Sequence, residues 1–332
     1  MPGRRGSRVK PSVLVTQRIP EQALALVQAV CDVQFDSQEQ CLTPEALRRA
    51  VVGKKGMICL VTDQIDAQVL EAGTALKVVA NVAVGYDNID IQAATQRGIV
   101  VTNTPGAVTE ATADLTWGLL LSIARRIPEG ERYIRAGQWR EWKFMFMLGH
   151  DIYEQTLGIV GMGRIGQAVA RRAQGFGMRV LYHNRRCLDA ALEKALGVTW
   201  VELPTLLQQA DFVSMHVPLT VETTHLISEA ELRMMRPTAY LINTARGAVV
   251  DEKGLVRALT EGWIAGAALD VFEREPEIPQ ALLALENVVL VPHIGSASVA
   301  TRTKMAVMAA ENLLAAVRGD RPPNAVNPEV YG

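Results

Sequence analysis

The sequence has little cysteine, no excess of either charge and no long apolar run. Its four cysteines show neither the Cys-x-x-Cys spacing of metal and redox sites nor the density of a disulfide-stapled domain. Lysine and arginine (34) balance aspartate and glutamate (35), which excludes a general polyanion-binding surface. The longest stretch without a formal charge, Asn287–Thr301, has about 15 residues and contains Pro292, whereas a membrane helix needs roughly 20. These absences predict a protein with neither nucleic-acid nor membrane partners.

The composition is that of a folded, enzyme-sized protein. Hydrophobic residues make up 49% of the 332 residues, enough for real cores, and the length predicts two domains. The basic start, with Arg4, Arg5 and Arg8, leads into no apolar segment of a signal peptide. We therefore expect a cytoplasmic location in a reducing compartment.

Short apolar runs recur along the chain, with helical stretches between them. Most are unbroken rather than alternating, as expected when both faces of a parallel sheet are covered. This alternation predicts right-handed βαβ units and a doubly wound α/β architecture. The predicted strands are Ser12–Thr16, Met57–Val61, Val78–Asn81, Ile99–Asn103, Leu157–Val160, Arg179–Tyr182, Asp211–Met215, Thr238–Asn243, Gly266–Asp270 and Val288–Val291.

Two long helices suggest how the domains are joined. Ala111–Arg125 is predicted as a long buried helix, and the last helix, about Ser296–Arg318, follows the final strand and can return to the first domain. We therefore predict a discontinuous substrate domain of residues 1–105 and 297–332. The dinucleotide-binding domain, residues 106–296, is inserted into it.

A glycine-rich loop follows one predicted strand directly. The sequence Leu157-Gly-Ile-Val-Gly161-Met-Gly163-Arg-Ile-Gly166 contains G-x-G-x-x-G and opens an amphipathic helix. The first glycine permits the tight turn, the second lets a pyrophosphate approach the backbone, and the third lets helix and strand pack closely. Free N–H groups at the helix start then face the phosphates. The predicted cofactor loop is Gly161, Met162, Gly163, Arg164, Ile165 and Gly166.

The end of the next strand bears on which dinucleotide is bound. About 18 residues after Gly166, where NAD-binding chains usually place a carboxylate, this sequence has Asn184, followed by Arg185 and Arg186. Without the carboxylate a 2′-phosphate is not repelled, and an arginine fork can bind it. These three residues favour NADP(H) as the cofactor, with NAD(H) possible. The alternative is a pair of solvated surface arginines.

Three further strand ends carry residues capable of chemistry. Arg246, Glu275 and His293 each follow an apolar strand, and Asp270 stands at a strand terminus. The guanidinium of an arginine suits a carboxylate-bearing substrate, and a histidine with a carboxylate partner can deliver a proton to a carbonyl oxygen. Taken singly, each has an ordinary alternative as surface charge or a structural contact. The scattered histidines and unpaired cysteines offer no metal-ligand cluster.

These motifs together resemble the D-isomer-specific 2-hydroxyacid dehydrogenases. The resemblance rests on the glycine loop, Thr244-Ala-Arg246-Gly, Asp270-Val-Phe-Glu-Arg-Glu275-Pro and Pro292-His293-Ile-Gly-Ser, and it covers roughly residues 12–328. Within the family the sequence looks most similar to glyoxylate/hydroxypyruvate reductases. Supporting segments are Asn81-Val-Ala-Val-Gly85-Tyr-Asp-Asn-Ile-Asp, Val101-Thr-Asn-Thr-Pro-Gly106 and Leu148-Gly-His-Asp-Ile-Tyr-Glu-Gln-Thr-Leu-Gly158.

The resemblance implies two flavodoxin- or Rossmann-like domains with parallel sheets and an active site in the cleft between them. It implies that Arg246 binds the substrate carboxylate, that His293 is the proton donor and that Glu275 holds its imidazolium. Backbone N–H groups around Val84 and Gly85 are implied to clamp the carboxylate. Further implied cofactor contacts are Asp270 at the nicotinamide end, Val217, Pro218, Thr244 and Ala245.

One segment rich in aromatic residues and methionine, Gln138–Asp151, has no clear period. It can be a loop that lines the core or a dimer interface, because exposed aromatic and methionine clusters mark association surfaces. The resembling reductases are dimers in which an aromatic from this region approaches the partner's substrate pocket. Trp142 is the candidate for that role, and a homodimer is expected.

The predicted function is NADPH-dependent reduction of a small 2-keto acid, glyoxylate or hydroxypyruvate, to the D-2-hydroxy acid. Two alternatives stay open. The substrate can be another 2-keto acid, of phosphoglycerate, phenylpyruvate or branched type. The chain can also resemble the dinucleotide-sensing corepressors of this fold, which act mainly by binding proteins.

Overall fold

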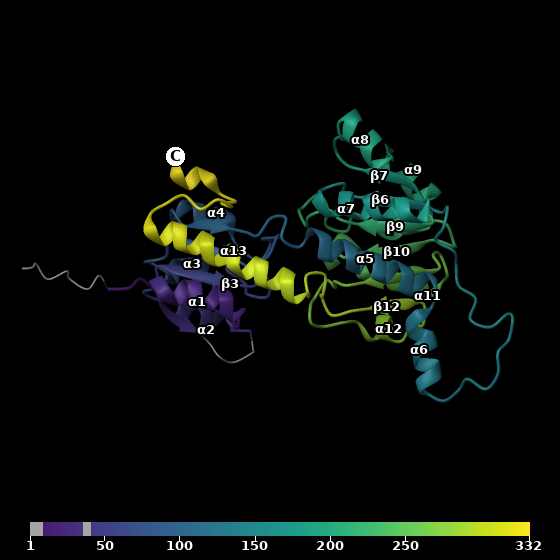
Figure 1. The fold of residues 1–332 in the computed structure, drawn as a ribbon, viewed down its shortest axis with the longest axis horizontal. Coiled ribbons are helices and arrows are strands. Elements are labelled where there is room, and N and C mark those ends of the chain that lie inside the picture. Colours follow the sequence, from purple (N-terminus) through teal and green to yellow (C-terminus); the bar gives the residue numbers. More distant parts are fainter. Residues whose placement is uncertain (1–8, 36–40) are drawn as a thin grey trace, which may run out of the picture. The chain divides into compact units, whose positions relative to one another are not determined.

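The computed structural model describes residues 9–35 and 41–332 (Figure 1). The basic residues Arg4, Arg5 and Arg8 lie outside the described residues. The chain divides into two compact units, one that runs to Val108 and resumes at Ser298–Gly332, and one formed by Thr109–Ala297. Each unit contains one sheet, and all named strand pairs are parallel. The predicted α/β class with two parallel sheets is confirmed.

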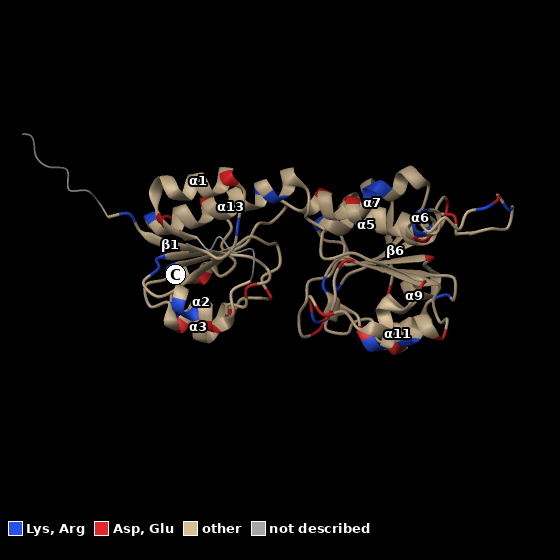
Figure 2. Cartoon of the chain, turned by 90° about the horizontal axis from the view of Figure 1, so that it is seen from below, with Lys and Arg blue, Asp and Glu red and all other residues tan. Residues whose placement is uncertain are grey.

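The first unit is built on a five-stranded sheet of order β2-β1-β3-β4-β5. Its central strands are buried along their whole length, as the apolar runs predicted. Helices α1 and α13 cover one face and α2 and α3 the other (Figure 2). The strands are β1 (Ser12–Val15), β2 (Asp32–Phe35), β3 (Gly56–Cys59), β4 (Val78–Asn81) and β5 (Val100–Thr102). The helices are α1 (Glu21–Val30), α2 (Pro44–Ala50), α3 (Ala67–Ala72), α4 (Ile91–Gln96), α13 (Val299–Arg318) and the short η3 (Pro328–Tyr331).

The second unit is built on a seven-stranded sheet of order β12-β11-β10-β9-β6-β7-β8. Helices α5 and α7 lie on one face, and α9 and α11 on the other (Figure 2). The strands are β6 (Thr156–Val160), β7 (Arg179–His183), β8 (Val198–Trp200), β9 (Phe212–Met215), β10 (Tyr240–Asn243), β11 (Gly266–Leu269) and β12 (Val288–Leu290). The helices are α5 (Thr109–Ala124), α6 (Ile127–Arg135), α7 (Arg164–Ala173), η1 (Gln174–Phe176), α8 (Ala190–Leu196), α9 (Leu203–Gln209), α10 (Glu229–Met234), η2 (Gly247–Val249), α11 (Glu252–Thr260) and α12 (Gln280–Leu283).

Helix α5 is the main buried support of the second sheet. Its Trp117 stacks on Phe176 with 4.7 Å between ring centroids, and its indole Nε1 donates to Val169 O at 3.2 Å. Both faces of the sheet therefore carry an apolar core, and the polar loops at the strand ends are left for function.

All ten predicted strands are present, with ends that differ by at most two residues. The structure adds β2 and β8, which the sequence did not predict. Both lie at a sheet edge, and β2 alternates between exposed and half-buried residues, so neither contains an apolar run. The last helix starts at Val299 rather than about Ser296, because the Ser298 hydroxyl accepts from Thr301 N and caps it.

No helix within the described residues is both long enough and apolar enough to cross a lipid bilayer.

Candidate active site

The three glycines of the loop between β6 and α7 have different surroundings. A Cβ on Gly161 (φ +100°) would lie 2.6 Å from the carbonyl carbon of His216, and one on Gly166 would lie 2.3 Å from Gly161 O. A Cβ on Gly163, the N-cap of α7, would meet no atom of residues 9–35 and 41–332 within 4 Å. The fold itself thus requires Gly161 and Gly166, whereas Gly163 borders open space at the helix start. A pyrophosphate fits there, beside the free N–H groups of the first turn.

The other predicted cofactor residues lie at the same edge of this sheet. Strands β9 and β7 are the two neighbours of β6, so their carboxyl ends flank the glycine loop. Val217-Pro218 follows β9, and Asn184 follows β7. Thr244-Ala245 follows β10, one strand further along, where the Thr244 hydroxyl lies 2.9 Å from that of Thr116. The loop, including Met162, Arg164 and Ile165, and these strand ends fit a dinucleotide.

Asn184 has a contact that the sequence did not predict. Its side-chain Oδ1 accepts from Met162 N at 2.7 Å, and its carbonyl accepts from Trp200 Nε1 at 3.1 Å. The residue thereby ties the end of β7 to the glycine loop. Arg185 and Arg186 beside it are exposed.

The residues predicted as catalytic follow three adjacent strands. Arg246 comes after β10, Glu275 after β11 and His293 after β12, and these strands are neighbours in the sheet. His293 Nδ1 lies 2.7 Å from Glu275 Oε2, and Phe272 N donates to Glu275 Oε1 at 3.0 Å. The structure therefore brings the three residues to one edge, as predicted; their roles stay predictions.

The electrostatics of this edge keep Glu275 ionised. Burial alone would raise the pKa of its carboxyl group. The hydrogen bonds from His293 and Phe272 N, together with the positive charges of His293 and Arg246, outweigh burial and lower that pKa. A carboxylate is thus present to stabilise an imidazolium.

Asp270 holds the loop that carries His293. Its oxygens accept from Ile294 N at 2.6 Å and from Gly295 N at 2.8 Å, and its carbonyl accepts from His293 N at 2.9 Å. These bonds support His293 in a left-handed backbone conformation (φ 52°). Burial, followed by the negative charge of Glu275, raises the pKa of Asp270 despite those bonds. The cofactor contact implied for Asp270 stays a prediction.

A buried asparagine at the end of β10 fixes the turn of Arg246. Asn243 Nδ2 donates to Arg246 O at 2.9 Å, and Asn243 Oδ1 accepts from Ala245 N at 3.0 Å. The next residue, Gly247, packs so closely that a Cβ would lie 1.9 Å from the carbonyl carbon of Phe272. Asn243 is not among the residues predicted from the sequence, although a polar residue at the end of a buried apolar strand is a signal that could have indicated it.

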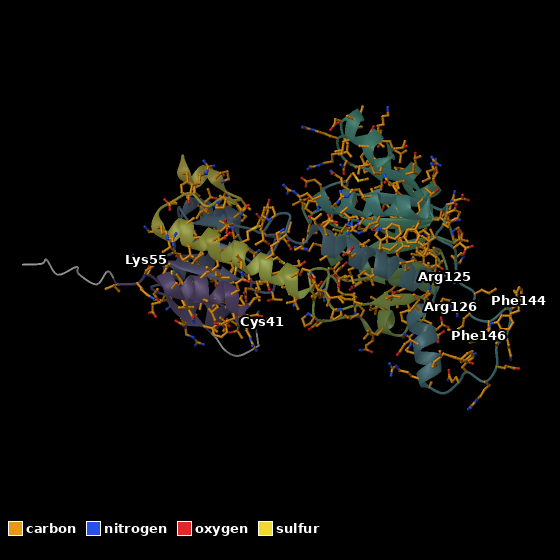
Figure 3. All side chains as sticks on the ribbon, in the orientation of Figure 1. Cys41, Lys55, Arg125, Arg126, Phe144 and Phe146 are labelled. Atoms are coloured by element: carbon orange, nitrogen blue, oxygen red, sulfur yellow. The ribbon has the colours of Figure 1, made fainter. Side chains whose placement is uncertain are left out.

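The other predicted substrate residues, Val84, Gly85 and Trp142, lie on other segments of the chain. Val84 and Gly85 follow β4 in the first unit, and both are half-buried. Trp142 lies in the segment after α6 and is 74% exposed. Figure 3 shows Phe144 at the outer edge of that segment and Phe146 nearer α6. The segment Gln138–Asp151 therefore does not line the core of its own unit. The interpretation as a core-lining loop is wrong, and the dimer interface stays a prediction.

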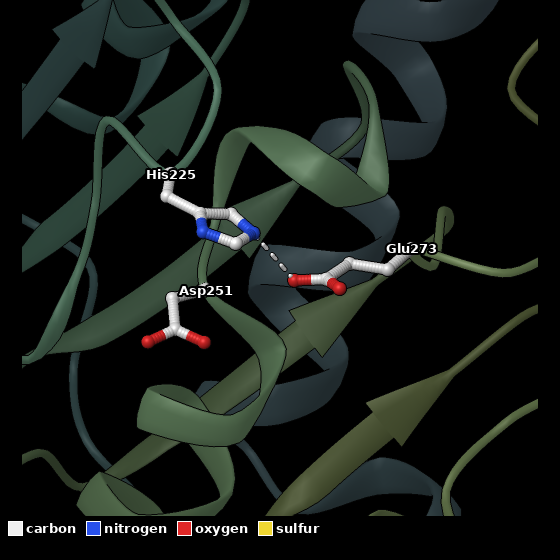
Figure 4. Close-up of side chains that lie close together, drawn as sticks. All are labelled: His225, Asp251 and Glu273. Atoms are coloured by element: carbon white, nitrogen blue, oxygen red, sulfur yellow. Dashed lines mark hydrogen bonds and ion pairs between the residues drawn. The ribbon is translucent and has the colours of Figure 1, made fainter.

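One group of side chains in the second unit has the composition of a metal site. The possible ligand atoms of His225, Asp251 and Glu273 lie within 4.8 Å of one another (Figure 4). However, Glu273 Oε1 accepts from His225 Nε2 and from Glu252 N, and Asp251 Oδ1 accepts from Lys253 N. The carboxylates thus serve the N-terminus of α11, whose positive dipole end disfavours a cation. We interpret the group as a helix-capping ion pair.

Comparison with known proteins identifies the family. Residues 117–295, more than half of the chain, match the model described as D-isomer specific 2-hydroxyacid dehydrogenase, NAD binding domain. The chain belongs to the D-isomer specific 2-hydroxyacid dehydrogenases. The predicted resemblance is confirmed, and with it the use of a nicotinamide dinucleotide as cofactor.

Relatives of this family member are similar over nearly its whole length. It is 55% identical over 324 residues to a glyoxylate reductase of Korarchaeum cryptofilum (strain OPF8), covering 97% of each chain. It is 48% identical over 326 residues to a glyoxylate reductase of Thermococcus litoralis, covering 97% of this chain and 98% of that one. A solved structure of an NADPH-dependent glyoxylate/hydroxypyruvate reductase from Sinorhizobium meliloti, in complex with NADP and malonate, is 36% identical. Its TM-score is 0.85, and the match covers 96% of this chain and 97% of that chain.

Proposed function

We propose that this dehydrogenase reduces glyoxylate and hydroxypyruvate to the corresponding 2-hydroxy acids, of D configuration where C2 is chiral, with NADPH as the preferred reductant. The observation that carries the proposal is the Glu275–His293 pair, 2.7 Å apart, at the sheet edge where Arg246 follows the adjacent strand. The high identity to the glyoxylate reductase of Korarchaeum cryptofilum supports the choice of substrate.

In this proposal Arg246 binds the substrate and His293 supplies the proton. The planar guanidinium can hold a carboxylate oxygen and the carbonyl oxygen of a 2-keto acid together, and its charge stabilises the developing alkoxide. Because His293 Nδ1 faces Glu275, the proton is donated from Nε2 to the carbonyl oxygen. Glu275, kept ionised, stabilises the imidazolium before that transfer. The reduced nicotinamide, when bound, supplies the hydride that the carbonyl carbon takes up.

The substrate carboxylate is also bound by peptide N–H groups around Val84 and Gly85. Peptide N–H groups bind anions without a counter-charge, and both residues come directly after the end of β4. Both residues belong to the unit that runs to Val108 and resumes at Ser298.

The preference for NADPH follows from the end of β7. Asn184 is neutral and does not repel a 2′-phosphate, and the exposed guanidinium groups of Arg185 and Arg186 can bind one. The Sinorhizobium meliloti reductase, which is NADPH-dependent by its name, is consistent with this preference. We expect the enzyme to use NADH as well, with a lower kcat/KM than NADPH.

The active protein is a homodimer. The segment after α6 exposes large apolar side chains, among them Trp139 (56%), Trp142 (74%), Phe144 (78%) and Met145 (71%). Such a cluster is typical of an association surface, and a second copy of the chain covers it in this proposal. Trp142 then approaches the substrate pocket of the partner copy.

A matrix of initial rates tests the proposal. NADH and NADPH are each combined with glyoxylate, hydroxypyruvate, pyruvate and phenylpyruvate. The expected result is the highest kcat/KM for glyoxylate or hydroxypyruvate with NADPH. A higher value for phenylpyruvate or pyruvate would assign another substrate, and no turnover with any combination would overturn the enzymatic role.

A further inference from the structure

Three successive peptide N–H groups after β4 have no acceptor within the described part of the chain. They belong to Val84, Gly85 and Tyr86, and no backbone or side-chain oxygen there receives any of them. All three residues are at least partly exposed. Since an unpaired N–H group is costly unless water or a ligand meets it, this stretch is suited to an anion.

The direction of each N–H group is fixed by the carbonyl group of the same peptide. Ala83 O accepts from Thr104 N at 2.8 Å, Val84 O from Asn103 Nδ2 at 2.8 Å, and Gly85 O from Asn81 Nδ2 at 3.0 Å. In a trans peptide the C=O and N–H bonds point in opposite directions. The hydrogen bonds to these carbonyl groups therefore point the N–H groups of residues 84, 85 and 86 away from the donors Thr104 N, Asn103 Nδ2 and Asn81 Nδ2.

The side chain of Asn81 is itself held rigidly. It is only 1% exposed, and its Nδ2 also donates to Asn88 Oδ1 at 3.0 Å. Asn88 Nδ2 in turn donates to Leu60 O at 3.1 Å and to Asp63 O at 2.9 Å. Both donors of each amide are thus used, which fixes their orientation and makes Asn81 a stiff support.

We propose that Asn81 and Asn103 are positioning residues for a carboxylate clamp formed by the peptide N–H groups of Val84, Gly85 and Tyr86. The inference rests on the proposed function and adds Tyr86 N to the expected contacts. Neither asparagine touches the substrate; each holds a carbonyl group so that the following N–H group faces the carboxylate of a 2-keto acid.

The first test is Asn81→Ala in the full chain. We expect the KM for glyoxylate and the inhibition constant of oxamate, a carboxylate-bearing analogue, to rise about tenfold, the effect of losing one well-oriented hydrogen bond. We expect kcat to change by less than about threefold, because the clamp binds ground state and transition state alike. The Kd for NADPH is expected to stay unchanged, since the glycine loop belongs to the other unit.

Asn327→Ala is the matched control. Asn327 is also fully buried in the first unit, where its Nδ2 donates to Thr95 Oγ1 and Ile99 O and its Oδ1 accepts from Val101 N. It supports the start of β5 rather than the clamp. We expect Asn327→Ala to lower Tm about as much as Asn81→Ala does, and to leave the KM for glyoxylate and the inhibition constant of oxamate unchanged.

A second variant covers the case in which Asn81→Ala does not fold. Asn103→Ala removes the bond to Val84 O from a half-buried side chain, and the same rise in KM and in the oxamate constant is expected. Wild-type values of both constants in folded variants would overturn the positioning role of Asn81 and Asn103 while the proposed function stands. A wild-type chain that reduces no 2-keto acid would overturn the proposed function first.

Discussion

His293 and His225 each face a glutamate at hydrogen-bonding distance, 2.7 Å and 2.9 Å, in different surroundings. His293 follows β12, and its partner Glu275 follows β11, the neighbour of the strand that Arg246 follows. The glutamate of His225, Glu273, instead accepts from Glu252 N at the start of α11. The pairing with a carboxylate therefore does not by itself distinguish a proton donor. What distinguishes the His293 pair is that the positive charge of Arg246 acts on its glutamate, Glu275.

This difference makes a direct prediction for the two histidines. His293→Ala is expected to lower kcat for glyoxylate by about 10²-fold or more, the usual contribution of a positioned proton donor. His225→Ala, which breaks an ion pair of similar length, is expected to change kcat by less than about threefold. Steady-state kinetics at saturating NADPH measure both. Equal losses of kcat in the two variants would contradict the role of His293 as proton donor.

Asn184 gives the second prediction at this scale. Asn184→Asp keeps an oxygen for Met162 N, so the glycine loop stays held, but adds a negative charge where a 2′-phosphate would lie. We expect kcat/KM with NADPH to fall roughly ten- to hundredfold relative to kcat/KM with NADH, the scale of a hydrogen bond to a charged group. The control is Asn184→Ala, which removes the acceptor without adding charge and is expected to impair both cofactors. An unchanged ratio in the aspartate variant would contradict the cofactor assignment.

At the scale of elements, the turn from β6 into α7 needs glycine for two separate reasons, close backbone packing and the approach of a ligand. Gly161 and Gly166 are required because backbone atoms occupy the space that a side chain would need. Gly163 faces open space among the described residues, so their packing does not require a glycine there. The remaining reason for a glycine at 163 is the approach of a ligand.

Alanine substitutions separate these two reasons. Gly163→Ala is expected to leave the Tm of the cofactor-free protein within about 2 °C of wild type and to weaken NADPH binding more than tenfold. Gly166→Ala is expected to lower Tm by several degrees, although alanine is the better helix former, because its Cβ would overlap Gly161 O. Thermal melts and a fluorescence titration with NADPH measure the two effects. A Gly163→Ala variant as unstable as Gly166→Ala would refute this division.

At the scale of the whole molecule, the exposed aromatic segment after α6 sets the expected assembly. Its large apolar side chains are mostly exposed; Phe146 reaches Tyr133, with ring centroids 5.1 Å apart, but stays 39% exposed. Exposed apolar area of this kind is stabilised when another surface covers it.

Light scattering after size exclusion tests this assembly. At micromolar concentration we expect a mass of about 72 kDa, twice that of the 36.2 kDa chain. A double variant, Trp142→Ala with Phe144→Ala, is expected to shift the mass toward one chain. Leu283→Ala, at a residue of α12 that is 50% exposed, is the control and is expected to leave the mass unchanged. A monomeric wild type at this concentration would contradict the homodimer.

The sequence by itself determined those features that depend on neighbours along the chain. The apolar runs gave ten strands, and the spacing of Gly161, Gly163 and Gly166 gave the strand–loop–helix turn. The order of Arg246, Glu275 and His293 after successive strands was readable for the same reason, because the carboxyl ends of parallel strands share one edge. Strands β2 and β8 were missed because β2 alternates between exposed and half-buried residues and β8 contains a single buried residue, so neither forms an unbroken apolar run.

Only the tertiary structure decided which polar residues hold the site in place. Asp270 reaches the N–H groups of Ile294 and Gly295, and Asn103 reaches the carbonyl group of Val84, across gaps of 19 to 25 residues in the sequence. Such bonds depend on strand order and on the path of each loop, which a local pattern does not encode. The sequence around an asparagine does not show whether its side chain faces water or supports a clamp. Its hydrogen-bond partners depend on tertiary packing and not on spacing along the chain.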